Sequence, residues 1–170
     1  AFVLAREAGQ DPETAFAAGL LHDVGRIVLD VYFPRTFLAI LRYRDRHDVW
    51  IRDAEAGVMG FDHCAVGERV ARRWRLPEQI LQAIAWHHQP HRQEASDPIT
   101  GIVHVADVLA RGLQVGNPGD DAIPMLCEQT LSRLDMDWHV LRRCLEQAEL
   151  YLDEAREMVH RALQRVTLAV

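Results

Sequence analysis

The chain of 170 residues has the length of one domain, which excludes two large domains. Its composition, 49% hydrophobic and 26% charged, is typical of a globular protein whose core needs no disulfides. The formal net charge of −6 argues against general binding to nucleic acid or to an anionic membrane, so we expect no DNA and no membrane among its partners. All nineteen positive charges are arginine, which excludes chemistry that needs a lysine amine.

Apolar residues recur with the 3.6-residue period of a helix along nearly the whole chain, which predicts an all-α fold. Capping Asp11 and the following Pro12 predict a helix that runs unbroken to about Tyr32. Further helices are predicted at 34–46, 52–59, 63–76, 77–88, 98–115, 124–133 and 137–168. The turn cluster GNPGDD at 116–121 separates the last two from the rest.

Three widely spaced cysteines, Cys64, Cys127 and Cys144, include no C-x-x-C pair. This pattern predicts reduced thiols and neither a disulfide framework nor a thiolate zinc site. The sequence has no signal-peptide pattern and no run of eighteen uncharged apolar residues, so we expect a cytoplasmic protein. The helical pattern at residues 1–9 has no preceding cap, which predicts further N-terminal helices in the natural protein.

Ionisable side chains among buried neighbours need a partner or a metal, because burying an unpaired polar group costs several kcal/mol. In the predicted helix 12–32, Asp23 borders an apolar stripe that includes Leu20, Ile27 and Val31. His22 lies on the adjacent face, where small side chains leave room for a ligand. The doublet is therefore predicted to project into a crowded, partly apolar place.

Three later helices also carry polar groups on their apolar faces. His63 lies on the inward face of the helix that Asp62 caps. His87 and His88 continue the buried face of the next helix. Asp107 lies on the apolar side of helix 98–115.

Imidazole and carboxylate groups that point inward from four helices suit iron, manganese, zinc or nickel better than calcium. The alternative is a scaffold whose buried histidines only hydrogen-bond one another. The remaining histidines lie beside charged or loop residues and are predicted to be ordinary surface residues: His47, His91, His104, His139 and His160.

The segment GLLHDVGRIVL, residues 19–29, resembles the signature of the HD superfamily of metal-dependent phosphohydrolases. Residues 55–90 resemble its HDOD branch, with the patterns G-x-D-H-x-x-V-G, W-x-L-P and A-I-x-x-H-H-x-P in order. The resemblance covers a motif-bearing core at about 14–115 and implies an HD-domain-like helical bundle. The C-terminal helices at about 124–168 match only in being helical, and we treat residues 1–170 as one domain.

The resemblance implies metal-ligand roles for six residues: His22, Asp23, His63, His87, His88 and Asp107. A first ion would be held by the His-Asp doublet and the later aspartate, together with an earlier histidine that would precede Phe2. A second ion would be held by His63 and by either His87 or His88, with Asp23 as the bridge. The family therefore implies one or two divalent ions of iron, manganese, zinc, nickel or magnesium, or a related pocket that binds none.

HDOD domains are similar to signalling output modules of bacterial response regulators, so the resemblance implies an upstream receiver or sensor domain, or other signalling proteins, as partners. Cyclic-di-GMP phosphodiesterases of the HD-GYP branch carry a Gly-Tyr-Pro segment after the paired histidines. Here His88 is followed by Gln89-Pro90-His91-Arg92, so that activity is not expected.

The leading interpretation is thus a signal-transduction output module that keeps an HD-type metal or ligand pocket. The alternative is an active divalent-metal-dependent phosphohydrolase or phosphodiesterase on a nucleotide or phosphoester. In that case Asp23 and Arg26 would be catalytic, with Arg26 neutralising substrate charge but unable to donate a proton at neutral pH. The long C-terminal helix is compatible with a homodimer.

Overall fold

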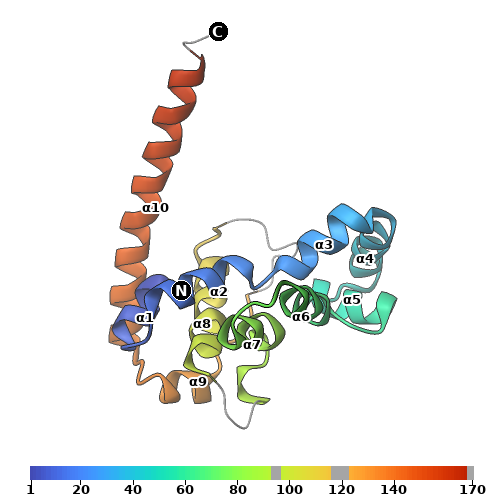
Figure 1. The fold of residues 1–170 in the computed structure, drawn as a ribbon, viewed down its shortest axis with the longest axis horizontal. Coiled ribbons are helices and arrows are strands. Elements are labelled where there is room, and N and C mark those ends of the chain that lie inside the picture. The colour runs from blue at the N-terminus through green and yellow to red at the C-terminus, as the bar shows by residue number, and fades with distance from the viewer. Residues whose placement is uncertain (93–96, 116–122, 168–170) are drawn as a thin grey trace.

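The computed structural model describes residues 1–92, 97–115 and 123–167 of the chain. Within these ranges it contains helices and no strand, so the predicted all-α fold is confirmed (Figure 1). In chain order the helices are α1 (Phe2–Glu7), α2 (Pro12–Leu21), α3 (Val24–Tyr32), α4 (Pro34–His47), α5 (Ile51–Met59), α6 (His63–Trp74), α7 (Glu78–Trp86), the short 3-10 helix η1 (Pro90–Arg92), α8 (Pro98–Gly112), α9 (Glu128–Arg133) and α10 (Trp138–Thr167). The predicted turn at 116–121 lies outside the described residues.

The doublet His22-Asp23 interrupts the helix that the sequence predicts from residue 12 to residue 32. α2 ends at Leu21 and α3 begins at Val24, while Asp23 has φ −99° and ψ 16°, outside the α-helical range. The single-helix prediction is wrong because an apolar period can continue across a two-residue turn. Adjacent residues of an unbroken helix point about 100° apart, so the turn is what allows both side chains to enter one pocket.

The same break explains why only part of the predicted apolar stripe, including Val24, is buried. Leu20, Ile27 and Val31 are exposed to 71%, 61% and 61%, while Val24 and Leu29 are the buried apolar side chains of α3. A stripe drawn on one continuous helix has the wrong phase once the helix changes direction. Apolar side chains are therefore left at the surface of both α2 and α3.

Capping side chains define the starts of three helices. Asp11 accepts a hydrogen bond from the backbone N–H of Glu13 at the start of α2, as predicted. Asp62 caps α6 in the same way, and Asp97 caps α8. The predicted short helix at 124–133 begins later, at Glu128.

Two apolar clusters hold the helices together. The larger one joins α1, α2, α7, α8 and the start of α10, with Ile84, Ile102 and Leu141 almost fully buried. The smaller one joins α4 and α5 around Ile40 and Ile51. Since α2 packs on α7 and α8 while α3 packs on α6, the α2–α3 junction meets α6, α7 and α8 at one place.

A glycine sets the distance between α3 and α6. A Cβ atom on Gly25 would lie 2.0 Å from the carbonyl oxygen of His63 and 2.8 Å from the backbone nitrogen of Gly67. Only a residue without a side chain allows this approach. The contact brings the start of α3 against the first turn of α6, where His63 and Cys64 lie.

α10 extends as a single long helix away from the other helices (Figure 1). Its start packs on α1 through Leu141 and Cys144, which belong to the larger cluster. In the part of the chain that the structure describes, no helix combines the length and the apolar character that crossing a membrane requires.

Candidate metal centre

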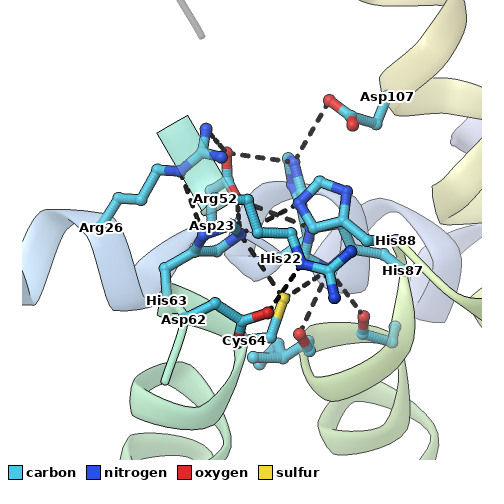
Figure 2. Close-up of polar contacts among 12 residues, drawn as sticks. His22, Asp23, Arg26, Arg52, Asp62, His63, Cys64, His87, His88 and Asp107 are labelled. Atoms are coloured by element: carbon cyan, nitrogen blue, oxygen red, sulfur yellow. Dashed lines mark hydrogen bonds and ion pairs between the residues drawn. The ribbon is translucent and has the colours of Figure 1, made fainter. Parts of the chain in front are cut away.

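Polar side chains converge at the α2–α3 junction from several helices (Figure 2). They include the six metal-ligand candidates of the sequence analysis: His22, Asp23, His63, His87, His88 and Asp107. His63 and His87 are fully buried, and the others are partly buried. The structure thus brings the candidates together.

A first group consists of His22, Asp23 and His87, whose donor atoms lie within 4.8 Å of one another. Asp23 Oδ1 lies 3.6 Å from His87 Nε2, and Asp23 Oδ2 lies 3.6 Å from His22 Nε2. His22 Nε2, Asp23 Oδ1 and His87 Nε2 are buried without a hydrogen-bond partner among the described residues. Because buried polar atoms normally have a partner, three such atoms facing one another fit a divalent metal ion.

Backbone carbonyls hold these two imidazoles in the tautomer that a metal needs. His22 Nδ1 donates to the carbonyl of Gly19 at 2.7 Å. His87 Nδ1 lies 3.2 Å from the carbonyls of both Ala83 and Ile84. A proton on Nδ1 leaves the Nε2 lone pair free for coordination, and this is the usual arrangement behind a metal-ligating histidine.

His63 is held in the same tautomer by Glu55, a buried carboxylate of α5. Glu55 Oε2 accepts a hydrogen bond from the His63 backbone N–H at 2.8 Å and lies 2.6 Å from ring Nδ1. Neither side chain is exposed to solvent. The opposite ring atom, His63 Nε2, lies 3.1 Å from Asp23 Oδ1 and 3.1 Å from His88 Nε2.

Asp107 reaches the cluster from α8. Its Oδ1 lies 3.7 Å from His22 Nε2, and Arg111 Nε donates to both of its oxygens at 3.1 and 3.2 Å. The carboxylate of Asp107 is therefore oriented by an arginine one turn later and lies at the side of His22.

Arg26 points toward the cluster and not toward solvent. Its Nη1 donates to Asp23 Oδ2 at 3.1 Å, and its Nε lies 3.5 Å from Glu55 Oε1 and 3.3 Å from His63 Nδ1. Only 11% of the side chain is exposed. The guanidinium thus balances the charge of two carboxylates within the protein.

The pKa values of Asp23 and His63 move in opposite directions. Burial alone would raise the pKa of Asp23, but the close approach of His63 and the charges of His22 and Arg26 outweigh it and hold this pKa far below the usual value. Burial lowers the pKa of His63, yet the close contacts of its ring with Asp23, Cys64 and Glu55 raise it well above the ordinary value. A proton on His63 and a metal ion therefore compete for the same lone pair.

His87 and His88 favour the neutral form that ligates a metal. Burial, followed by repulsion from His22, lowers the pKa of His87 to about 3. Burial and the charge of His87 lower the pKa of His88 far below the ordinary value. For Asp107, the nearby His22 imidazole and the charge of Arg111 outweigh burial and lower the pKa to about 2.

Sequence reasoning missed Glu55 and the position of Cys64. Glu55 lies four positions after Ile51 and four positions before Met59. Helical spacing therefore places it on the apolar face of α5, where it could have been recognised. The lack of a C-x-x-C pair says nothing about which histidines lie near Cys64 in the fold. In the structure its Sγ lies 3.5 Å from His63 Nε2.

The prediction that His104 lies at the surface is wrong. His104 is 5% exposed, its Nδ1 donates to the carbonyl of His87 at 2.8 Å, and its Nε2 accepts from the backbone N–H of Cys127 at 3.2 Å. His104 shares a helix face with Arg111, whose charge suggests an exposed position, but Arg111 is itself buried. Three other histidines are exposed, as predicted: His47, His91 and His139. The side chain of His160 lies outside the described residues.

Known proteins resemble this chain in family and in fold. A family model described as HDOD domain matches residues 1–90. An HDOD domain protein of unknown function from Geobacter sulfurreducens has a similar crystal structure, with a TM-score of 0.68, 26% identity, and 95% of this chain and 56% of that chain covered. The structure of a putative phosphohydrolase from Shewanella amazonensis has a TM-score of 0.63 at 19% identity, covering 85% of this chain and 53% of that one, and it shows likeness of fold alone.

Curated relatives are much longer than the matched segment. An uncharacterised protein of Treponema pallidum is 26% identical over 105 residues, which is 61% of this chain and 20% of that protein. A ribonuclease Y of Thermus thermophilus is 30% identical over 108 residues, which is 64% of this chain and 14% of that protein. The chain thus spans a fifth or less of the length of these relatives.

Proposed function

The chain belongs to the HDOD domain family, and we propose that it acts as a signal-transduction output module whose buried histidine cluster holds a divalent metal ion. One observation carries the metal part of this proposal: His22 Nε2, Asp23 Oδ1 and His87 Nε2 face one another, buried and without hydrogen-bond partners among the described residues. Asp107 would complete the first set of ligands from α8, at the side of His22.

The position of Arg26 favours a regulatory role over a catalytic one. A phosphoester substrate needs a cation directed at its oxygens. The guanidinium of Arg26 is instead engaged by Asp23 and Glu55 and is largely buried. We propose that it stabilises the cluster itself and does not bind substrate.

A bound divalent ion would supply Lewis acidity and fix the relative positions of α2, α6, α7 and α8. Iron, manganese, zinc, nickel and magnesium remain the candidate ions, because the donor set combines imidazoles with carboxylates. The ion would link helices that are far apart in the sequence. Metal occupancy would in this way control how rigidly the module presents its surface.

We propose a receiver or sensor domain, or another signalling protein, as the partner. Exposed apolar side chains on α2, on α3 and at the residue between α3 and α4 support this, since such groups commonly mark interaction surfaces: Phe16, Leu20, Ile27, Val31, Tyr32 and Phe33. The much greater length of the curated relatives is consistent with additional domains in proteins of this kind. The long α10 also offers a surface for a second copy of the chain.

The second candidate is a metal-dependent phosphohydrolase. It is favoured by the proximity of Asp107 to His22 and by the unsatisfied oxygen of Asp23, since the resemblance assigns these three residues, with an earlier histidine, to one metal ion. In this reading a nucleotide or another phosphoester is the substrate. Asp23 would hold the ion and Arg26 would turn toward the substrate.

Turnover assays distinguish the two candidates. The protein is loaded with Mn²⁺ or Fe²⁺ and assayed against a panel of phosphomonoesters and cyclic nucleotides. The regulatory proposal predicts stoichiometric metal and no turnover. Turnover that is abolished by Asp23→Ala or Asp107→Ala would replace it with the phosphohydrolase.

A further inference from the structure

A second group of metal-binding side chains contains a cysteine. His63, Cys64, His87 and His88 offer one donor atom each, and these atoms lie within 4.8 Å of one another. Cys64 is 5% exposed and is not in a disulfide. Figure 2 shows its sulfur beneath the imidazoles, directed into the cluster.

The distances around His63 Nε2 fit a tetrahedral site. Zinc–nitrogen bonds of about 2.0–2.1 Å and zinc–sulfur bonds of about 2.3 Å place two nitrogens about 3.4 Å apart, and a nitrogen and a sulfur about 3.6 Å apart. His63 Nε2 lies 3.1 Å from His88 Nε2 and 3.5 Å from Cys64 Sγ. Two imidazole nitrogens and one sulfur are therefore already near ligand spacing.

A second observation points to a ligand at the same place. His87, fully buried, belongs to this group as well as to the first, and its Nε2 has no hydrogen-bond partner among the described residues. Its Nδ1 lies 4.0 Å from Cys64 Sγ but faces the carbonyls of Ala83 and Ile84, so His87 borders the cysteine site and is not counted among its ligands. Glu55 holds His63 from behind, so that the Nε2 lone pair faces the sulfur and His88.

We propose that Cys64 is a thiolate ligand of a metal ion that His63 and His88 also hold, so that this half of the pocket selects zinc or another thiophilic ion over magnesium and manganese. The inference rests on the proposed metal pocket and deepens it. Thiolate favours zinc, cobalt and ferrous iron, whereas magnesium and manganese prefer oxygen ligands. The thiol proton leaves to solvent when the sulfur becomes a ligand, because a coordinated thiol is deprotonated.

Cobalt spectroscopy tests this assignment without reference to activity. The full chain is freed of metal with a chelator and titrated with Co²⁺ under anaerobic conditions. We expect a sulfur-to-cobalt charge-transfer absorption in the near ultraviolet, in addition to the visible bands of bound cobalt. Cys64→Ser should abolish the charge-transfer absorption and lower zinc affinity at least tenfold, while manganese affinity stays unchanged.

Cys144→Ser is the matched control, because Cys144 is equally buried but packs between α10 and α1, away from the histidines. It should keep the charge-transfer absorption. Cys64→Ala provides a second test, and circular dichroism verifies that each variant is folded. Bound cobalt without charge transfer, or unchanged zinc affinity in both Cys64 variants, would overturn the thiolate ligand and leave the metal pocket standing. Failure to bind any cobalt or zinc would overturn both.

Discussion

At the scale of single residues, Glu55 controls the orientation of His63. Its buried carboxylate accepts from the backbone and ring of His63, so Glu55→Gln removes the charge that holds Nδ1 protonated. Loss of such a partner behind a ligand costs about 10- to 100-fold in metal affinity. We expect a decrease of that size for zinc in a competition assay with a chromophoric chelator.

Glu68→Gln is the control for this experiment. Glu68 lies on α6 but pairs with Arg72, near the surface, in an i,i+4 contact of the kind that contributes little. The zinc affinity of the Glu68→Gln protein should equal that of the wild type. Equal affinities in all three proteins would show that Glu55 does not position His63.

His104 makes a separate contribution to the dependence of stability on pH. Burial lowers its pKa, and its Nε2 must stay unprotonated to accept from Cys127. Above pH of about 6.5 both the folded and the unfolded state carry neutral His104. Below that pH only the unfolded state takes up the proton, so stability falls by at most about 1.4 kcal/mol per pH unit.

Urea unfolding at pH 7.5 and pH 5.5, with a chelator present, measures this loss. His104→Gln should lose less stability on acidification than the wild type does. Other histidines titrate in both proteins, so the difference isolates His104. An identical pH dependence in the two proteins would contradict the assignment.

Helical spacing predicted the burial of some residues of the site correctly and failed for others, because it reports only the face of a residue's own helix. His63 and His87 are buried because they continue apolar faces, a property that spacing reports. His104 is buried by contacts with a carbonyl of α7 and with the segment before α9, neither of which its own helix specifies. Spacing could have found Glu55, but not its contact with His63, which lies on another helix.

At the scale of helices, Gly25 allows α3 to approach α6. A methyl group at this position would meet backbone atoms of His63 and Gly67, which cannot move aside as a flexible side chain can. Overpacking of this kind costs about 1–3 kcal/mol, and the displacement should also separate Asp23 from His63. We expect Gly25→Ala to lower the free energy of unfolding in urea by that amount and to weaken zinc binding.

Gly112→Ala is the matched control, since a Cβ atom at this helical glycine meets nothing within 4 Å. It should change stability by less than about 1 kcal/mol, toward greater stability, because alanine favours the helix. Similar effects of the two substitutions would mean that the contact between α3 and α6 does not determine the geometry of the site.

The pattern of the sequence predicted most helices but not the break between α2 and α3. Prolines and capping aspartates mark the starts of α2, α4, α6 and α8, and these signals act locally. The turn at His22-Asp23 has no such signal. It is stabilised by contacts of α3 with α6 that come from a distant part of the chain.

At the scale of the whole molecule, a metal ion would join four helices and should stabilise the fold. Ligand at 100 times its dissociation constant stabilises by about 2.7 kcal/mol, which corresponds to roughly 5 to 10 °C in Tm for a chain of this size. We expect a shift of this size when Zn²⁺ is added to the chelator-treated protein. Asp23→Asn should show a smaller shift than the wild type, because the site proposed at Cys64, His63 and His88 does not include Asp23. An equal shift in the variant would place the stabilising ion away from Asp23.

The most direct test of the account is the metal content of the wild-type protein, purified anaerobically without chelator and measured by elemental analysis. The geometry of His22, Asp23, His63 and His87 predicts at least one transition-metal ion per chain, and a marked loss of that ion in Asp23→Ala. A folded wild-type protein that contains no metal, and takes up none on titration with Zn²⁺, Mn²⁺ or Fe²⁺, would contradict it.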